Sequence, residues 1–263
     1  MNTTSNASPS ASAPAAAPVL LVTGASRGIG AATALRAARA GWDVAVNYTR
    51  DKAAAEHVAA GVREAGRRAL VVQADVSCEP DVLAMFAAVD AGLGRLTGLV
   101  NNAGVVDMPS RVDEMSVERL ARMWAINLTG PFVCAREAVR RMSRRHGGAG
   151  GVIVNLSSAA AKLGSPAQYV DYAASKGGID TFTHGLALEV ANEGVRVNGV
   201  RPGIIDTDIH ASGGLPDRVA QMAPNVPMKR AGSADEVAAA IVWLLSDDAS
   251  YVTGSTIDVT GGR

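Results

Sequence analysis

Short apolar runs alternate with longer stretches of helical periodicity from residue 18 to the end of the chain. The runs carry apolar side chains on both faces, a pattern typical of strands buried on both sides of a parallel sheet. We predict seven such strands, at residues 19–23, 44–47, 69–74, 99–101, 152–156, 195–200 and 256–259.

Stretches with helical spacing fill the intervals between these strands. We predict helices at residues 29–40, 52–65, 79–93, 116–145, 172–192 and 233–245. Consecutive parallel strands need a connection of about a dozen residues or more, and each interval is long enough to provide it. The pattern therefore predicts an α/β protein with a doubly wound, seven-stranded parallel sheet of the Rossmann type and helices on both faces. A barrel would need eight strand–helix units.

Composition narrows the possible classes of protein. The 25 basic and 25 acidic residues give no formal net charge, which argues against a nucleic-acid partner held mainly by charge. No apolar stretch has the length of a membrane span, so we expect no membrane partner. The two cysteines and four histidines lack metal-ligand spacing, so we expect no metal site, no disulfide and a cytoplasmic location. Residues 1–17 predict a disordered tail, and residues 18–263 a single domain.

A glycine-rich turn closes the first predicted strand and opens the first predicted helix, with the sequence Thr-Gly-Ala-Ser-Arg-Gly-Ile-Gly at residues 23–30. Glycine permits a tight turn at Gly24, lets the backbone approach a ligand at Gly28 and allows close helix–strand packing at Gly30. The free amides at the helix start would bind a pyrophosphate. The GxxxGxG spacing, with no Lys-Ser/Thr pair after it, excludes a P-loop nucleoside triphosphatase. The candidate cofactor-binding residues here are Gly24, Ser26, Arg27, Gly28, Ile29 and Gly30.

This turn resembles the one that begins members of the short-chain dehydrogenase/reductase family, and further motifs extend the resemblance to residues 19–262. Asn-Asn-Ala-Gly at 101–104 resembles the family element that supports the sheet beside the cofactor. Asp-Val at 75–76 resembles the pair that contacts adenine, and Pro-Gly at 202–203 followed by Thr207 resembles the segment that holds the nicotinamide carboxamide. The resemblance thus implies cofactor contacts by Asp75, Val76, Asn102, Ala103, Gly104, Pro202, Gly203, Ile205 and Thr207.

The end of the second strand bears on which nicotinamide cofactor is bound. An acidic residue about 20 positions after the glycine turn binds the ribose 2′-hydroxyl of NAD, whereas a basic or neutral residue tolerates the 2′-phosphate of NADP. Tyr48 occupies this position, and Thr49 and Arg50 follow it. Arg27 and Arg50 could together clamp a phosphate, so we expect NADP(H) to be preferred. A small shift of the turn would bring Asp51 to the ribose, so NAD(H) remains an alternative cofactor.

Tyr172 and Lys176 stand four residues apart at the start of a predicted helix. Residues with this spacing share a helical face, so the phenol and the ammonium can point into one cleft. A phenol with the ordinary pKa of about 10 ionises little near neutral pH. A nearby ammonium and the positive nicotinamide of an oxidised cofactor would lower that pKa toward the working range. This predicts Tyr172 as the acid–base residue. The resemblance also implies that both residues contact the cofactor.

Ser158 is the predicted catalytic serine by resemblance. It follows the fifth strand, where a hydroxyl can stabilise charge that develops on a substrate oxygen. It lies fourteen residues before Tyr172, one more than in many members of the family, and we expect the additional residue in the loop 164–171. Ser157 is the alternative serine. Tyr169 is a weaker candidate phenol because it has no lysine four residues later.

Asn127 matches the family's helix asparagine, which holds a water in a proton relay with Lys176. A helix-interior asparagine bonded to its own backbone is the alternative interpretation. Pro131 nearby predicts a local distortion of the long helix at 116–145.

Together these residues predict an NADP(H)-dependent oxidoreductase that transfers a hydride between nicotinamide and a carbonyl or secondary alcohol of a small molecule. A non-catalytic dinucleotide sensor and an NAD-preferring sugar or alcohol dehydrogenase remain alternatives, and a 3-oxoacyl thioester is one candidate substrate. The irregular segment 204–232 is long enough to cover a substrate. Members of the family are commonly tetramers formed through two long helices, so the resemblance implies a homotetramer formed through helices 116–145 and 172–192.

Overall fold

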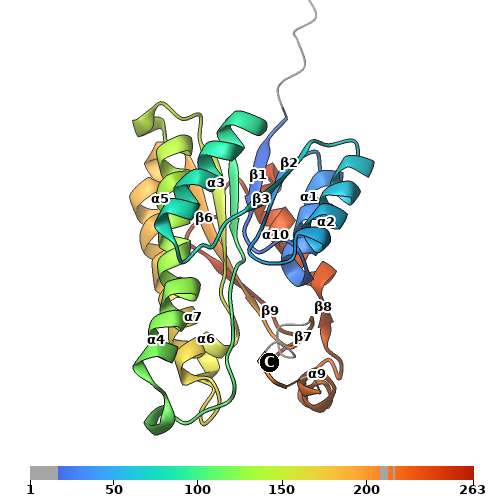
Figure 1. Cartoon of the computed structure of the whole chain (residues 1–263), viewed down its shortest axis with the longest axis vertical. Coiled ribbons are helices and arrows are strands. Elements are labelled where there is room, and N and C mark those ends of the chain that lie inside the picture. The colour runs from blue at the N-terminus through green and yellow to red at the C-terminus, as the bar shows by residue number, and fades with distance from the viewer. Residues whose placement is uncertain (1–16, 208–212, 216) are drawn as a thin grey trace, which may run out of the picture.

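The computed structural model describes residues 17–207, 213–215 and 217–263 (Figure 1). Seven strands form one parallel sheet in the order β3-β2-β1-β4-β5-β6-β9. This confirms the predicted doubly wound sheet, with strand ends that differ by at most two residues from the prediction. Of the tail predicted at residues 1–17, only residue 17 lies within the described residues. The strands are β1 (Val19–Val22), β2 (Asp43–Tyr48), β3 (Ala69–Gln73), β4 (Gly98–Asn101), β5 (Gly151–Leu156), β6 (Val195–Pro202) and β9 (Thr256–Val259).

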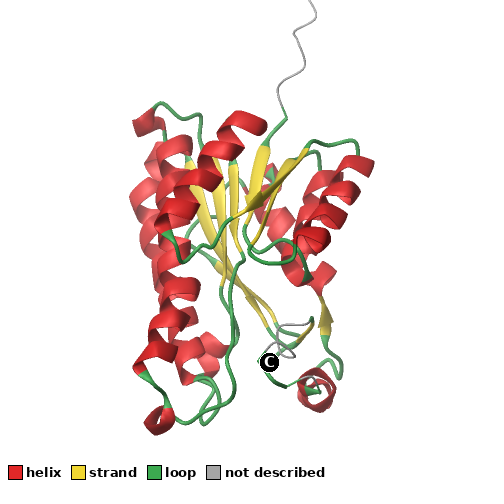
Figure 2. Cartoon of the chain, viewed as in Figure 1, coloured by secondary structure: helices red, strands yellow, loops and turns green. Residues whose placement is uncertain are grey.

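Helices cover both faces of the sheet, and Figure 2 shows the strands between the two groups. The continuous apolar runs arise because both faces of the sheet are covered. In β1, Leu20 and Val22 lie in one hydrophobic cluster, and Val19 and Leu21 lie in the other. The first cluster includes side chains of α1, α2 and α10, and the second includes side chains of α3, α5 and α7. These helices are α1 (Gly28–Arg39), α2 (Lys52–Glu64), α3 (Glu79–Gly92), α5 (Gly130–Met142), α7 (Val170–Val190) and α10 (Ala234–Leu245).

The prediction of one uninterrupted helix over residues 116–145 is wrong. An α-helix, α4 (Val117–Trp124), leads into a π-helical segment, Ala125–Thr129, and then into α5, which ends at Met142. Pro131 near the start of α5 has no amide hydrogen to donate, and its ring crowds the carbonyl of Asn127 four residues earlier. The predicted distortion beside Pro131 is therefore confirmed. A π-helical segment of this kind often marks a functional site.

Irregular segments follow the carboxyl ends of β4, β5 and β6. The segment after β6 contains a two-stranded sheet formed by β7 (Ile205–Asp206) and β8 (Gly232–Ser233), and a short helix, α9 (Arg218–Met222). Residues 208–212 and 216 of the predicted covering segment lie outside the described residues. The remaining short helices are η1 (Val112–Glu114), η3 (Arg144–His146), α6 (Ala160–Leu163), η4 (Ala191–Glu193), η5 (Ala223–Asn225) and η6 (Asp247–Ala249).

The strand order reverses at β1, which lies between β2 and β4. In doubly wound sheets, ligands bind beyond the carboxyl ends of the strands at such a switch point. The glycine-rich turn after β1 and the Asn-Asn-Ala-Gly segment after β4 meet there.

Candidate active site

The glycine-rich turn leads from β1 into the first turn of α1. Gly24 and Gly28 have left-handed backbones, with φ of 61° and 57°, which residues other than glycine rarely adopt. Arg27 precedes α1, and no side chain among the described residues caps the helix there. The first amides of α1 are thus available to a ligand. A phosphate group fits this helix start because the amides lack helical acceptors and the helix dipole favours negative charge.

Asn102 holds the turn in place. Its Nδ2 donates hydrogen bonds to the carbonyl oxygens of Thr23 and Gly24, at 2.8 and 2.9 Å. In return, Thr23 Oγ1 accepts hydrogen bonds from the amides of Asn102 and Ala103, each at 3.0 Å. A methyl group on Gly30 would lie 2.5 Å from both Asn102 Nδ2 and the Gly24 carbonyl. The predicted motif residues after β1 and β4 therefore form one interlocked unit.

Asn47 is a positioning residue that the sequence interpretation missed. This buried side chain accepts a hydrogen bond from the Gly24 amide at 3.0 Å and donates one to the Ala74 carbonyl at 3.1 Å. It thus ties the turn to the end of β2 and to the residue after β3. In the sequence, this role could have been suspected because Asn47 is a single amide residue at the end of the otherwise apolar run 44–47.

The end of β2 presents basic and polar groups. Tyr48 is only 6% exposed and packs in the hydrophobic cluster, whereas Thr49 and Arg50 are exposed. Asp51 Oδ1 accepts a hydrogen bond from the Ala54 amide at 2.9 Å and so caps α2. The Asp51 carboxylate, which left NAD(H) as an alternative cofactor, is therefore hydrogen-bonded at the start of α2.

The Asp-Val pair after β3 forms a tight turn. Asp75 Oδ1 accepts hydrogen bonds from the Ser77 amide and hydroxyl, at 2.9 and 2.6 Å. The Val76 side chain is buried, and a methyl group on Gly130 would lie 2.9 Å from the Val76 carbonyl. The main chain and the Asp75 carboxylate are therefore the groups that this pair can offer an adenine ring.

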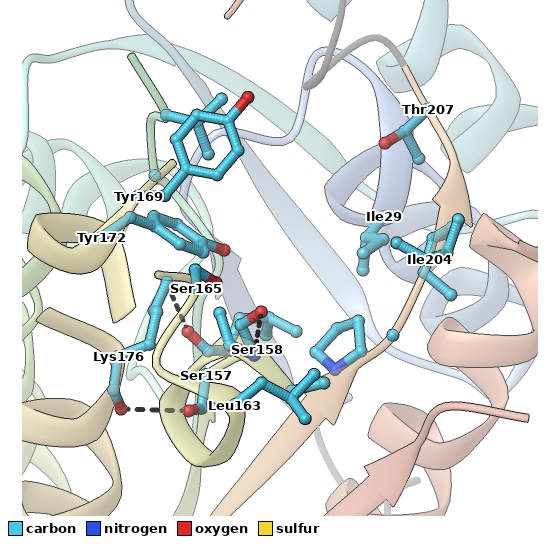
Figure 3. A pocket seen from close by; sticks show the side chains of 18 of the residues that line it. Ile29, Ser157, Ser158, Leu163, Ser165, Tyr169, Tyr172, Lys176, Ile204 and Thr207 are labelled. Carbon is cyan, nitrogen blue, oxygen red and sulfur yellow. Dashed lines mark hydrogen bonds between the residues drawn. The ribbon is translucent and has the colours of Figure 1, made fainter. Parts of the chain in front are cut away.

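A cavity lies beyond the carboxyl ends of β4, β5 and β6. In Figure 3, Tyr169 and Tyr172 project from one wall, and Ile29, Ile204 and Thr207 face them from the other. The cavity brings together many of the sequence-predicted residues. Those that line it are Ile29, Asn102, Gly104, Ser158, Tyr172, Lys176, Pro202, Gly203, Ile205 and Thr207.

Tyr172 and Lys176 lie on the first turns of α7 and face this cavity. Lys176 Nζ is 5.8 Å from the centre of the Tyr172 ring and donates a hydrogen bond to the Leu156 carbonyl at 2.6 Å. Burial lowers the pKa of Lys176 to about 8, and Asp180 only partly offsets this effect. Burial also raises the pKa of Tyr172, although a hydrogen bond with Ser158 lowers it. The net effect is a phenol that is less acidic than an exposed tyrosine.

The two serines after β5 have different surroundings. Ser157 Oγ is buried and donates a hydrogen bond to the Lys176 carbonyl at 3.1 Å. Ser158 is partly exposed and lines the cavity, and it accepts a hydrogen bond from the Ala160 amide at 3.1 Å. Its hydroxyl lies close enough to Tyr172 to lower the pKa of that phenol, against the larger effect of burial. Of the two hydroxyls, that of Ser158 is thus the one beside the phenol.

The loop between α6 and α7 carries backbone strain. Ser165 and Ala167 have φ of 47° and 56°, in the left-handed region that disfavours residues other than glycine. Ser165 also lines the cavity. The loop 164–171, where we expect the additional residue of the serine–tyrosine spacing, therefore shapes the wall of the site.

Asn127 lies in the π-helical segment and is fully buried. Its Oδ1 accepts from the Val105 amide and its Nδ2 donates to the Val105 carbonyl, both at 2.8 Å. A methyl group on Gly104 would lie 3.3 Å from Asn127 Oδ1 and 3.6 Å from Lys176 Nζ. Asn127 thus bonds to the main chain after β4 and not to the backbone of its own helix, although its Nδ2 also contacts the Met123 sulfur at 2.9 Å. Asn127 and Lys176 both approach Gly104.

A buried ion pair fixes the start of α7. Arg119 Nε donates to Asp171 Oδ2 at 2.8 Å, and its Nη1 donates to the Met108 carbonyl at 2.6 Å. The bond raises the pKa of Arg119. Sequence reasoning missed this pair because its members are 52 residues apart and no local pattern links them.

The described residues were also compared with the requirements of a metal site and of a membrane-spanning helix. No group of three or more His, Cys, Asp or Glu side chains suited to a metal ion occurs among the residues that the structure describes. Within the same ranges, none of the helices has the combined length and apolarity that crossing a membrane requires.

Comparisons with known proteins identify the family. A family model described as enoyl-(acyl carrier protein) reductase matches residues 24–263. The crystal structure of a short-chain type dehydrogenase/reductase from Mycobacterium marinum matches with a TM-score of 0.87 and 34% identity, covering 93% of this chain and 94% of that one. The chain belongs to the short-chain dehydrogenase/reductase family.

Two relatives named as an oxidoreductase and a dehydrogenase match this chain over nearly its whole length. The uncharacterized oxidoreductase YgfF of Escherichia coli is 57% identical over 93% of this chain and 99% of its own length. The 3β-hydroxysteroid dehydrogenase 1 of Eggerthella lenta is 42% identical over 92% of each chain. The short-chain dehydrogenase/reductase described here is accordingly an NAD(P)-dependent dehydrogenase or reductase.

Proposed function

We propose that this enzyme is NADP(H)-dependent and transfers a hydride between nicotinamide and a carbonyl or secondary alcohol of a small molecule. The observation that carries the proposal is the position of the Tyr172 phenol. It lies beside the Ser158 hydroxyl and 5.8 Å, ring centre to Nζ, from Lys176, in a cavity that Ile29 of the glycine-rich turn also lines. A structural tyrosine–lysine pair would not require such a cavity.

In the reducing direction, the chain's own groups act on the carbonyl oxygen, while bound NADPH would supply the hydride. The Ser158 hydroxyl donates a hydrogen bond to that oxygen and stabilises its developing negative charge. Tyr172 transfers its proton to the same oxygen, and burial keeps the phenol protonated for this role. The Lys176 ammonium stabilises the phenolate that remains. Asn127, the fourth member of the proposed catalytic set, would hold the water that returns a proton toward Lys176.

The preference for NADP(H) is supported by the end of β2. Arg50 is exposed there, Arg27 is exposed at the start of α1, and Asp51 caps α2 instead of extending toward the cofactor. A guanidinium binds a ribose 2′-phosphate through charge-assisted hydrogen bonds that a 2′-hydroxyl cannot match.

Assays across a substrate panel test the proposal. We would follow NADPH and NADH consumption with ketones, aldehydes and 3-oxoacyl thioesters, and the reverse reaction with alcohols and sugars. The proposal predicts turnover with faster use of NADPH. Faster use of NADH with sugars or alcohols would favour the NAD-preferring dehydrogenase, and tight NADPH binding without any turnover would favour the sensor.

We further propose that residues 18–263 form one domain and that the chain assembles as a homotetramer through α5 and α7. Exposed apolar side chains on these helices support the assembly: Phe132 is 46% exposed and Leu188 is 70% exposed. Sedimentation at the monomer mass would contradict it. The unpaired Cys78 and Cys134 support a cytoplasmic location, which cell fractionation would test.

A further inference from the structure

We propose that the carbonyl substrate carries a carboxylate, which Arg218 and Tyr169 bind at the end of the cavity away from Lys176. This inference rests on the proposed function and adds the chemical class of the substrate. It assigns a binding role to two side chains that the proposed hydride transfer does not use.

Tyr169 offers a hydrogen-bond donor to the cavity. Its side chain lines the cavity and is only 4% exposed, yet its buried hydroxyl has no hydrogen-bond partner among the described residues. Buried phenols usually have one, because an unsatisfied polar group is costly. Figure 3 shows Tyr169 on the same wall as Tyr172, with both phenols projecting from the start of α7.

Arg218 supplies a positive charge beside this phenol. It begins α9 and lines the cavity, with its Cζ 5.0 Å from the centre of the Tyr169 ring. Its Nε is buried without a hydrogen-bond partner, and no carboxylate among the described residues forms an ion pair with it. A partly buried guanidinium without a counter-ion is unfavourable, and a bound anion would offset that cost.

A second arginine near Tyr169, Arg119, differs from Arg218 because it has a carboxylate partner. Burial raises the pKa of Tyr169, and the charges of Arg218 and Arg119 partly offset this effect. Asp171 neutralises the charge of Arg119 through a 2.8 Å ion pair. The positive potential at the Tyr169 hydroxyl therefore comes mainly from Arg218.

The remaining lining of the cavity favours an anion as well. None of the described lining residues is Asp or Glu, whereas Lys176 and Arg218 are cationic. A cleft lined by one sign of charge raises the local concentration of the opposite one. One guanidinium and one phenol match the two oxygens of a singly charged carboxylate, whereas a phosphate dianion would require more donors.

Matched pairs of substrates test this inference. We would measure kcat and KM for a series of oxocarboxylates of increasing chain length and for their methyl esters, which differ only in the charged group. The wild-type enzyme should prefer an acid to its ester. Arg218→Leu should lower kcat/KM for that acid by about 10- to 100-fold, mainly through KM, and change the value for the ester by less than about twofold.

Three further variants complete the test. Arg218→Lys should restore part of the preference for the acid, and Tyr169→Phe should weaken it without affecting the ester. Arg122→Leu is the matched control, because this exposed arginine pairs with Asp107 and does not line the cavity. Binding of the corresponding saturated carboxylate, measured as an inhibition constant, should weaken in Arg218→Leu and in Tyr169→Phe but not in Arg122→Leu.

The outcomes separate this inference from the proposed function. Equal use of acid and ester by the wild type, or an unchanged acid preference in Arg218→Leu, would overturn the carboxylate site and leave hydride transfer intact. Arg218 would then only brace α9 against Tyr169. Turnover of neither compound, nor of any other member of the panel, would overturn the proposed function and this inference with it.

Discussion

Asp171 and Arg119 form a buried ion pair through two hydrogen bonds, directly before Tyr172 in the chain. The Asp171 side chain has no exposed surface, and that of Arg119 is 13% exposed. The pair joins α4 to the first turn of α7, so it determines where the Tyr172 phenol lies relative to Ser158.

We therefore predict that Arg119→Met destabilises the protein by about 3–5 kcal/mol, because it leaves a buried carboxylate without its partner. Urea unfolding measures this change, and kcat should fall in parallel as Tyr172 loses its fixed position. Arg122→Met on the same helix is the control. Its ion pair with Asp107 is largely exposed and should contribute about 1 kcal/mol or less. Equal effects of the two substitutions would show that the buried pair has no special role.

The lowered pKa of Lys176 predicts a specific dependence of stability on pH. Its usual pKa of 10.5 applies to the unfolded chain, and burial lowers the pKa to about 8 in the folded chain. Between these values the unfolded chain binds more protons than the folded chain, so stability rises with pH. Below the folded pKa both states are protonated, and the burial cost of the ammonium is fully present.

Comparison with Lys176→Met isolates this effect. The free energy of unfolding of the wild type, relative to the variant, should rise by about 2 kcal/mol between pH 7 and pH 9.5. Urea titrations at several pH values provide the measurement. Parallel curves for the two proteins would mean that burial does not shift the titration of Lys176.

The glycine-rich turn predicts a steric effect at Gly30. A methyl group there would meet Asn102 Nδ2 and the Gly24 carbonyl at 2.5 Å. Gly30→Ala should therefore destabilise the protein by about 1–3 kcal/mol and weaken NADPH binding in a fluorescence titration. Gly177→Ala is the control, because no atom lies within 4 Å of its added methyl group and α7 is helical there. That change should be neutral or stabilise by up to about 1 kcal/mol. Unimpaired NADPH binding by Gly30→Ala would contradict the interlocked turn.

Cofactor preference depends on Arg50 in this account. Arg50→Ala should raise KM for NADPH by about tenfold and leave KM for NADH nearly unchanged, since only the former carries the 2′-phosphate. Arg27→Ala should act in the same direction. Lys52→Ala, an exposed cation two residues after Arg50, is the control. An unchanged KM for NADPH in either arginine variant would remove that residue from the phosphate site.

Features with a local cause could be predicted from the sequence. The strands followed from continuous apolar runs, and the turn at Gly24 and Gly28 followed from the need for positive φ. The shared face of Tyr172 and Lys176 followed from helical spacing. Their catalytic and cofactor roles remain predictions.

Features that depend on tertiary contacts could not be predicted. The π-helical segment forms where Asn127 bonds to the main chain of Val105, 22 residues earlier. The raised pKa of Tyr172 depends on burial, which no local spacing encodes. Arg218 had no sequence signal, because its position against Tyr169 arises only when α9 packs beside the cavity.

Tyr172 is the proposed acid–base residue, and the kcat of Tyr172→Phe tests this role most directly. Tyr251→Phe is the matched control, because Tyr251 is fully exposed and does not line the cavity. We predict that Tyr172→Phe loses about 10²- to 10⁴-fold in kcat while it binds NADPH with unchanged affinity in a fluorescence titration, and that Tyr251→Phe keeps full activity. Full turnover by Tyr172→Phe would contradict the account.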